Sequence, residues 1–263
     1  MQTKASPPAD RHRYPPPLIL PVKREDVGPI AIFSFEATSW SPMGSFFNQS
    51  PDDGAKAVQN LEATLMAALE DPDRFTVMKA VDPDTGELAS YATWERNSHD
   101  RGRKDVDIEA KIIKAEHEGK KHESNNDQNP AEAAEKEESA NVDPRRRFGT
   151  HVAAETARFR DAWAAGMDYV EMRGMATAPR FQRRGYATAL LDWGHRRELD
   201  AERRVGFLVG SPVARPLYAS HGWHEVGQIV VDMCEFVPGA KAGDRGWGMW
   251  KLYHMIRLPR AVI

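Results

Sequence analysis

The chain has one cysteine, Cys234, in 263 residues, so it cannot form an internal disulfide and suits a reducing compartment. No apolar run approaches the ~18 residues needed to span a bilayer. The first ten residues, MQTKASPPAD, lack the apolar core of a signal peptide. These absences predict an intracellular, cytoplasmic protein with no membrane partner.

A marked excess of charge of either sign is also missing. Lys and Arg number 36 and Asp and Glu 39, giving a formal net charge of -3, which argues against broad nucleic-acid binding. His221 and His224 lack a third ligand at suitable spacing, so no metal is expected. What is present is 41% hydrophobic residues, enough for one sizeable core.

Two segments do not fit that core. Residues 1–17 are proline-rich and polar, which predicts a flexible leader. Residues 97–147 contain no aromatic residue and mix lysine with glutamate, so they bury too little apolar area to offset the entropy of ordering. We interpret them as an inserted tether, disordered or partly a solvated helix, and a docking role is the alternative. Residues 18–263 then form a single domain interrupted by this insertion.

Hydrophobic periodicity alternates between strand and helix along that domain. The pattern predicts an α/β fold with a central mixed sheet. Strands are expected at 18–22, 75–81, 88–94, 169–175, 205–210, 226–233 and 247–258, and helices at 25–37, 54–69, 150–165 and from 187, with a loop at 40–53.

The segment from Ala176 to Leu191, ATAPRFQRRGYATALL, joins an expected strand to a helix through a glycine turn. Unpaired amides in the first turn of a helix carry partial positive charge, and Gly185 lets the backbone approach an anion closely. Arg180, Arg183 and Arg184 add formal charge. Neither a Walker GKS/GKT nor a GxGxxG is present. The turn is therefore a candidate phosphate site; an ordinary glycine-initiated helix with solvent-facing arginines is the alternative.

Pro179, Gln182, Gly185 and Ala187 reproduce a PxxQxxGxA pattern, and residues 211–223 read SPxxxPLYxxxGW. Together these blocks resemble the coenzyme A loop and a following segment of the GNAT (GCN5-related N-acetyltransferase) superfamily, in particular its fungal members. The resemblance implies the GNAT fold: a mixed, mostly antiparallel sheet splayed between its fourth and fifth strands, with helices on both faces.

The resemblance also implies acetyl-CoA as co-substrate, with its pantetheine arm between the splayed strands. The residues it assigns to the cofactor are Met175, Ala176 and Thr177 for the arm, and Gln182, Arg183, Arg184, Gly185, Tyr186, Ala187 and Thr188 for the pyrophosphate.

Tyr218 matches the tyrosine acid of the family. Its reference pKa, about 10, exceeds that of a thiol, about 8.5, so it stays protonated at neutral pH and can donate to a departing thiolate. A tyrosine packed on a helix is the alternative.

Glu171 stands on the expected fourth strand, eleven residues before Gln182, where histone-modifying relatives carry a glutamate that deprotonates lysine through water. Strand alternation puts Arg173 on the same face. A catalytic base and a structural Glu171–Arg173 ion pair therefore both remain open.

The expected activity is transfer of an acetyl group to a primary amine of a small molecule or peptide, by direct attack in a ternary complex. No metal and no covalent intermediate on Cys234 are expected. The aromatic loop around Trp40, Phe46 and Phe47 and the loop 238–248 correspond in order to acceptor-shaping segments. Two alternatives remain: a catalytically degenerate acyl-CoA-binding module, and a regulatory subunit acting through its insertion. The acceptor and the oligomeric state stay open.

Overall fold

A computed structural model describes residues 15–39, 41–48, 50–98, 143–164, 166–236 and 248–260. Most of the predicted leader, residues 99–142 of the predicted insertion, Trp40 and most of the loop 238–248 lie outside the described residues. The division into leader, insertion and single domain therefore stays a prediction.

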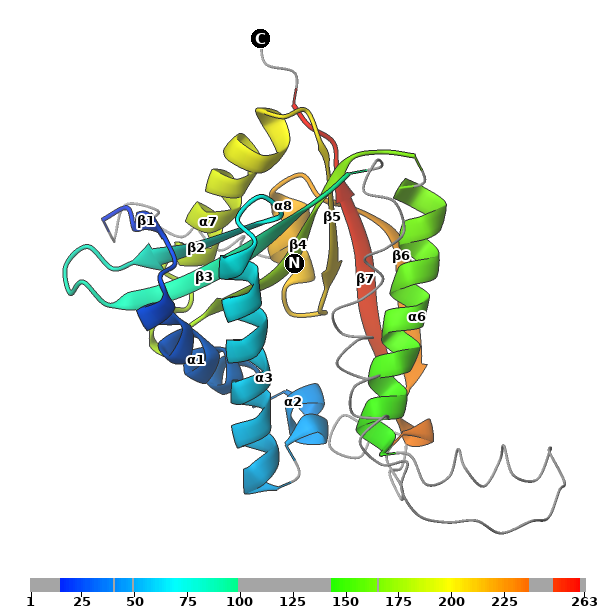
Figure 1. The fold of residues 1–263 in the computed structure, drawn as a ribbon. Helices are drawn as coiled ribbons and strands as arrows, with labels where there is room; N and C mark the ends of the chain where they lie inside the picture. Colours follow the sequence, from blue (N-terminus) through cyan, green and yellow to red (C-terminus); the bar gives the residue numbers. More distant parts are fainter. Residues whose placement is uncertain are drawn as a thin grey trace, which may run out of the picture.

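The described strands form one seven-stranded sheet in the order β1-β2-β3-β4-β5-β7-β6 (Figure 1). Only the central pair, β4 and β5, is parallel; every other neighbouring pair is antiparallel. This is the mixed, mostly antiparallel sheet that the sequence predicts. The strands are β1 (Leu18–Pro21), β2 (Phe75–Val81), β3 (Leu88–Asn97), β4 (Tyr169–Thr177), β5 (Val205–Gly210), β6 (His224–Asp232) and β7 (Met249–Arg257).

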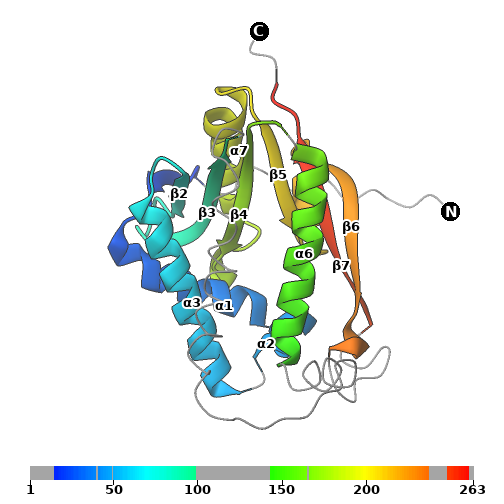
Figure 2. The ribbon, with the colours of Figure 1, turned by 45° about the vertical axis from the view of Figure 1, so that its right-hand side comes forward.

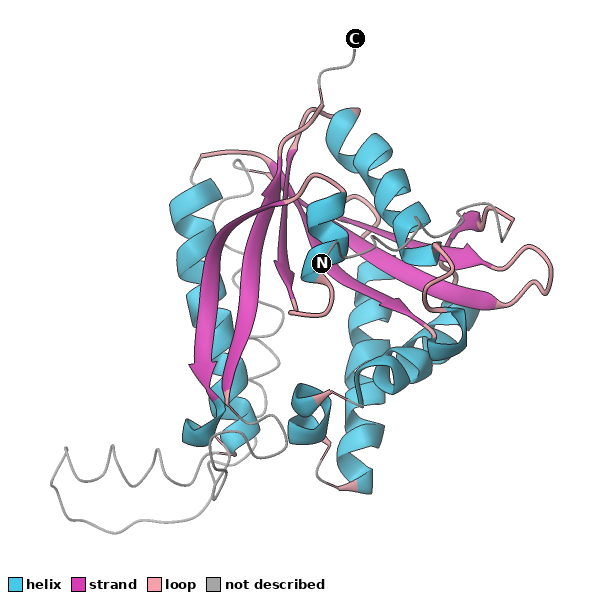
Figure 3. Ribbon diagram, turned by 180° about the vertical axis from the view of Figure 1, so that it is seen from behind, coloured by secondary structure: helices cyan, strands magenta, loops and turns pink. Residues whose placement is uncertain are grey.

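Helices cover both faces of the sheet (Figures 2 and 3). Alternation along β3 points Tyr91 and Trp94 to opposite faces. Tyr91 packs edge to face on Phe33, and Trp94 packs on His195, with ring centroids 6.1 and 6.4 Å apart. One face carries α1 (Val27–Ser39), α3 (Pro51–Glu70) and α6 (Pro144–Ala164), and the other carries α7 (Tyr186–Gly194), its π-helical continuation (His195–Asp200) and α8 (Arg215–Ser220).

The sheet opens between β4 and β5. The two strands pair only from Tyr169 to Met172 on β4, opposite Val205 to Leu208 on β5. Beyond that point β4 continues on β3, and the last two residues of β5 continue on β7. A register shift at Thr93 leaves Arg173 as an extra residue on β4, where the strands begin to part. The predicted splay is confirmed.

Two predicted boundaries were wrong. The expected loop 40–53 contains a short helix, α2 (Pro42–Phe47), and α3 already begins at Pro51. Ser41 and Ser50 cap these helices through their side chains, with proline in the first turn, and this start signal is carried by the sequence itself.

Likewise α6 begins at Pro144, six residues before the expected start at Thr150. Residues 144–147 of the predicted insertion are therefore helical. The reason is that Phe148 is buried, in contact with Phe46 and Phe236 at ring-centroid distances of 5.6 Å each, so tertiary packing extends the helix.

Candidate active site

The turn between β4 and α7 has the backbone conformation that an anion site needs. A short 3-10 turn (Pro179–Phe181) follows β4, and Gly185 caps α7 with a left-handed φ of 91°. Glycine adopts this conformation without steric cost, whereas Arg183, at φ 63°, is a non-glycine residue in the same region. The expected strand, turn and helix are thus all present.

The first turn of α7 presents unpaired backbone donors. The first hydrogen bond of the helix runs from the Ala189 amide to the Gly185 carbonyl, at 2.9 Å. Within the described residues the amides of the four preceding positions have no acceptor: Gly185, Tyr186, Ala187 and Thr188. Together with the helix dipole they favour an anion at this end of α7.

The three arginines of the turn behave differently. Arg180 pairs with Glu87 at 3.1 Å, and its guanidinium lies over the Phe181 ring, 4.9 Å from the centroid. The Arg184 guanidinium lies over the same ring at 5.5 Å. Arg183 is exposed and has no side-chain partner among the described residues. Arg183 is therefore the cation of this turn that is available to a ligand.

The loop is anchored from both sides. Gln182 Nε2 donates to the Thr177 carbonyl at 3.3 Å, which ties the turn back to the end of β4. The buried Tyr186 hydroxyl donates to Asp82, whose carboxylate also accepts the Asp84 and Thr85 amides at 3.0 Å. Burial first, and then the bond to Asp82, raises the pKa of Tyr186 to about 12. The Tyr186 side chain thus supports the loop.

Met175, Ala176 and Thr177 form the part of β4 beyond the β5 pairing. They are half-buried and pair with Ala92, Tyr91 and Ser90 of β3. No strand among the described residues pairs with their other edge, so this edge borders the opening where the sequence predicts an extended ligand arm. The loop and this edge are continuous along the chain.

Tyr218 lies on α8, on the face covered by α7, and is 6% exposed. Its ring packs edge to face on Trp223 at 6.4 Å. Burial, and to a smaller extent the neighbouring Tyr91, raises the pKa of Tyr218 well above its ordinary value. No described residue forms a hydrogen bond with its hydroxyl. A buried phenol that has no partner is available to a ligand group.

Glu171 lies on the opposite face, under α6, and is 4% exposed. Its carboxylate contacts Arg173 Nη1 at 3.1 Å and Arg160 Nη1 at 3.3 Å. The strand neighbour Glu95 is also buried and pairs with Arg74 at 2.6 Å and Arg173 at 3.4 Å. The Glu171–Arg173 pair, one of the two roles that the sequence left open, is present, and the second partner, Arg160, is one that the sequence did not reveal.

Among the other residues that the sequence singled out are Phe46, Phe47 and Cys234. Phe46 is fully buried against Phe148, and Phe47 is 37% exposed. Burial raises the pKa of Cys234, which disfavours its thiolate.

Within the described residues there is no cluster of His, Cys, Asp and Glu side chains that could hold a metal ion. The helices described here include none with the length and apolarity to cross a membrane.

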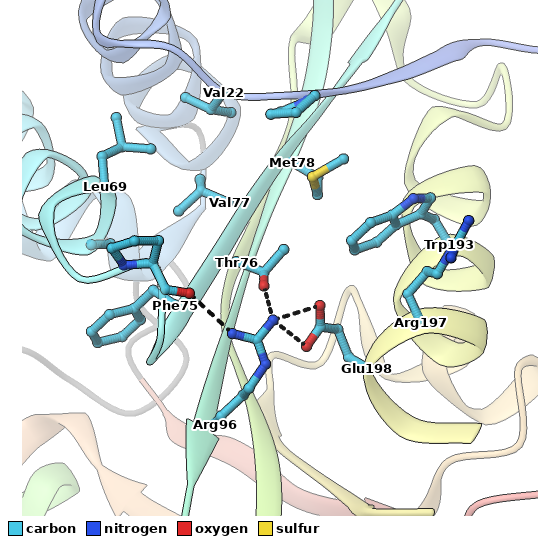
Figure 4. Close-up of a pocket in the computed structure, with 13 residues that line it drawn as sticks. Val22, Leu69, Phe75, Thr76, Val77, Met78, Arg96, Trp193, Arg197 and Glu198 are labelled. Atoms are coloured by element: carbon cyan, nitrogen blue, oxygen red, sulfur yellow. Dashed lines mark hydrogen bonds and ion pairs between the residues drawn. The ribbon is translucent and has the colours of Figure 1, made fainter. Parts of the chain in front are cut away.

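A pocket of about 630 Å³ lies toward the other end of α7 (Figure 4). Its apolar wall includes Leu69, Phe75 and Trp193. Arg96 within it is already bonded to Thr76, to the Pro72 carbonyl and to Glu198. We place the candidate site at the β4–β5 opening instead, because there the donors lack partners.

Comparison with known proteins supports the fold alone. No family model and no curated protein matches the sequence. Arylalkylamine N-acetyltransferase 2 from Aedes aegypti is similar in structure, with a TM-score of 0.56, 13% identity and coverage of 93% of this chain and 99% of that chain. A histone acetyltransferase HPA2 and related acetyltransferase from Corynebacterium glutamicum has a TM-score of 0.51, 17% identity and coverage of 93% and 97%. The chain therefore has the GNAT fold, as the sequence predicts.

Proposed function

We propose that this protein is a GNAT-type N-acetyltransferase that moves an acetyl group from acetyl-CoA to a primary amine, by direct attack in a ternary complex. One observation carries the proposal. The unpaired amides at the start of α7 follow β4 along the chain, and the ring of Tyr218, whose hydroxyl has no partner among the described residues, lies against Gly210 at the end of β5, so both sets of donors come from the two strands that part beyond Met172. A diphosphate and a thioester on one extended ligand would satisfy both sets of donors.

Each part of the site has a binding task in this proposal. The amides from Gly185 to Thr188 hold the pyrophosphate, with Arg183 adding charge. The free edge of β4, from Met175 to Thr177, bonds the amide groups of the pantetheine arm as an added strand would. Gln182, bonded to the Thr177 carbonyl, keeps the turn aligned with that edge. The four orphan amides fit a doubly charged anion, which supports acetyl-CoA as the ligand.

Tyr218 supplies the proton for the departing thiolate. Its raised pKa keeps the hydroxyl protonated at every physiological pH, as a donor requires. When the amine nitrogen bonds to the acetyl carbon, the carbon–sulfur bond breaks and the phenolic proton moves toward the sulfur. The edge-to-face contact with Trp223 holds the ring in place for this transfer.

Glu171 is the proposed base, which takes the amine proton through water. The alternative is a purely structural role, in which Glu171 only forms its ion pairs with Arg160 and Arg173. We expect Glu171→Gln to lower kcat/KM about 100-fold and to remove the acid limb of its pH profile, because a carboxylate base has to be ionised. The measurement is kcat/KM against pH for the native protein and the variant. An unchanged profile, with only a lower melting temperature, would assign Glu171 to the ion pairs alone.

The acceptor is proposed as a primary amine of a small molecule or a peptide. The two structural neighbours are named for an arylalkylamine and for a histone, which supports an amine acceptor and favours neither kind. Acceptor choice depends on loops, and the loop 238–248 lies almost wholly outside the described residues. We therefore propose only that the acceptor carries a primary amine.

A thiol-release assay across a panel of amines tests the activity. The native protein should release free coenzyme A thiol only when a suitable amine is present. Binding of acetyl-CoA without release for any amine in the panel would favour the alternative, a degenerate acyl-CoA-binding module. The panel should include polyamines, arylalkylamines, amino acids and peptides with free termini or lysines.

A further inference from the structure

We propose that the pocket near the end of α7 (Figure 4) is a second ligand site, which binds a small molecule with an apolar body and one carboxylate. The guanidinium of Arg197 and the indole N–H of Trp193 hold the carboxylate. This inference goes beyond the proposed acetyltransferase function and does not rest on it, because the acetyl-CoA site is proposed at the opposite end of α7, where the helix begins at Tyr186.

The size and the walls of the pocket are the first argument. Its volume of about 630 Å³ falls within the range of roughly 300–1,000 Å³ that is typical of small-molecule sites, which are mostly apolar with a few polar groups. Leu69 at the end of α3, Phe75 at the start of β2 and Trp193 on α7 line it. All three side chains are half-buried, so each still exposes apolar surface that a ligand can cover.

The ion pair in the wall of the pocket is the second argument. The Arg96 guanidinium pairs with the Glu198 carboxylate at 3.0 Å. It also donates to the Thr76 hydroxyl and to the Pro72 carbonyl, the latter at 3.2 Å. Glu198 is 5% exposed, so its carboxylate is held against Arg96 and away from water. The two opposite charges offset each other, and this pair fixes the wall without attracting an ion of either sign.

The two donors on the α7 side are the third argument. Arg197 is exposed at the rim of the pocket, and Trp193 lies four positions before it, about one helical turn away. Figure 4 shows both side chains extending from the same helix at one side of the pocket. Among the described residues, neither the guanidinium nor the indole N–H has a partner. Arg197 therefore leaves the described lining with an uncompensated positive charge.

These features together select the chemistry of the ligand. A guanidinium binds a carboxylate through two parallel N–H···O bonds, and an indole N–H can donate to the same group. A cationic ligand would be repelled by Arg197. A fully polar anion such as inorganic phosphate would leave the apolar wall facing water. A medium-chain carboxylic acid satisfies the cation and the wall at once.

Calorimetric titration of octanoate tests the site, with octanol as an uncharged comparison of the same chain length. We expect the native protein to bind one octanoate per chain with a dissociation constant below about 1 mM. Octanol should bind about tenfold more weakly, because its hydroxyl cannot form a charge-assisted pair with the guanidinium.

Three variants locate the bound acid. Arg197→Gln should weaken octanoate binding about tenfold and leave octanol binding unchanged, because it removes the charge and keeps most of the side chain. Trp193→Phe should weaken octanoate binding less, since the indole N–H is a neutral donor. Arg196→Gln is the matched control: Arg196 is exposed on the same helix but is not among the described residues that line the pocket. It should bind both molecules with native affinity, and neither arginine variant should change the melting temperature.

Equal octanoate affinity of Arg197→Gln and Arg196→Gln would overturn the inference, as would no binding at about 5 mM octanoate. Displacement of octanoate by saturating acetyl-CoA would also overturn it, because the nine residues of α7, about 14 Å of helix, separate the two sites. A native protein that sediments as a dimer and takes up no octanoate would assign the pocket to a second copy of the chain. None of these results depends on thiol release, so the proposed function stands or falls separately.

Discussion

Replacing Gly185 with valine should weaken acetyl-CoA binding about 100-fold. A β-branched residue at φ 91° is strained by about 1–3 kcal/mol, and the turn can relieve that strain only by rotating the backbone. Rotation moves the amides of Tyr186, Ala187 and Thr188 away from a shared anion. A loss of about 1.4 kcal/mol of binding free energy weakens affinity about tenfold, so the strain and the lost hydrogen bonds together account for the expected weakening of about 100-fold. Calorimetric titration of acetyl-CoA into the variant measures it.

Gly166→Val is the matched control for this prediction. Gly166 also has a left-handed φ, 77°, but it precedes the opposite end of β4. Its substitution should cost comparable folding free energy and leave acetyl-CoA affinity at the native value. Equal affinity of the Gly185→Val variant and the native protein would mean that these amides do not hold the ligand.

Replacing Tyr218 with phenylalanine should lower kcat about 100-fold, within the range of general acid catalysis, and leave acetyl-CoA affinity unchanged. The hydroxyl has no partner among the described residues, so its removal should not lower the free energy of unfolding. A drop in kcat without a drop in stability is the signature of a group that acts only on the substrate. Thiol release and thermal unfolding together measure both quantities.

The pH dependence follows from the raised pKa of Tyr218. Its proton stays bound above the ordinary pKa of 10.0, so the native enzyme should show no alkaline fall in kcat from this residue below pH 10.

Tyr253→Phe is the matched control for the Tyr218→Phe variant, because Tyr253 is half-buried on β7 and its hydroxyl has no hydrogen-bond partner within the described residues. Native turnover in the Tyr218→Phe variant would remove Tyr218 from the mechanism.

Much of the fold was predictable because its signals are local. The fifth strand was predicted at 205–210, where β5 lies, and strands were predicted at 75–81 and 88–94, where β2 and β3 pair with each other. Alternation and turn residues act within a few positions, so a single sequence displays them. The glycine turn before α7 belongs to the same kind of signal, since Gly185 is the residue that a left-handed helix cap requires.

Contacts between distant elements were not predictable in this way. Arg173 is two residues from Glu171, and alternation predicts both on one face, so the sequence offers that pair as one of two roles for Glu171. Arg160 reaches Glu171 from α6, and only the packing of that helix on β4 reveals it. The approach of Tyr91 to Gly174 likewise depends on the register of β3 against β4 and on the extra residue in β4. Charge and periodicity along one chain do not reveal which residues of two paired strands lie opposite each other.

Titration of acetyl-CoA into the native protein by calorimetry tests the account most directly. We predict saturable binding of one acetyl-CoA per chain with a dissociation constant in the micromolar range, about that of typical enzyme substrates. Absence of any heat of binding at about 1 mM acetyl-CoA, which corresponds to less than about 4 kcal/mol of binding free energy, would contradict it.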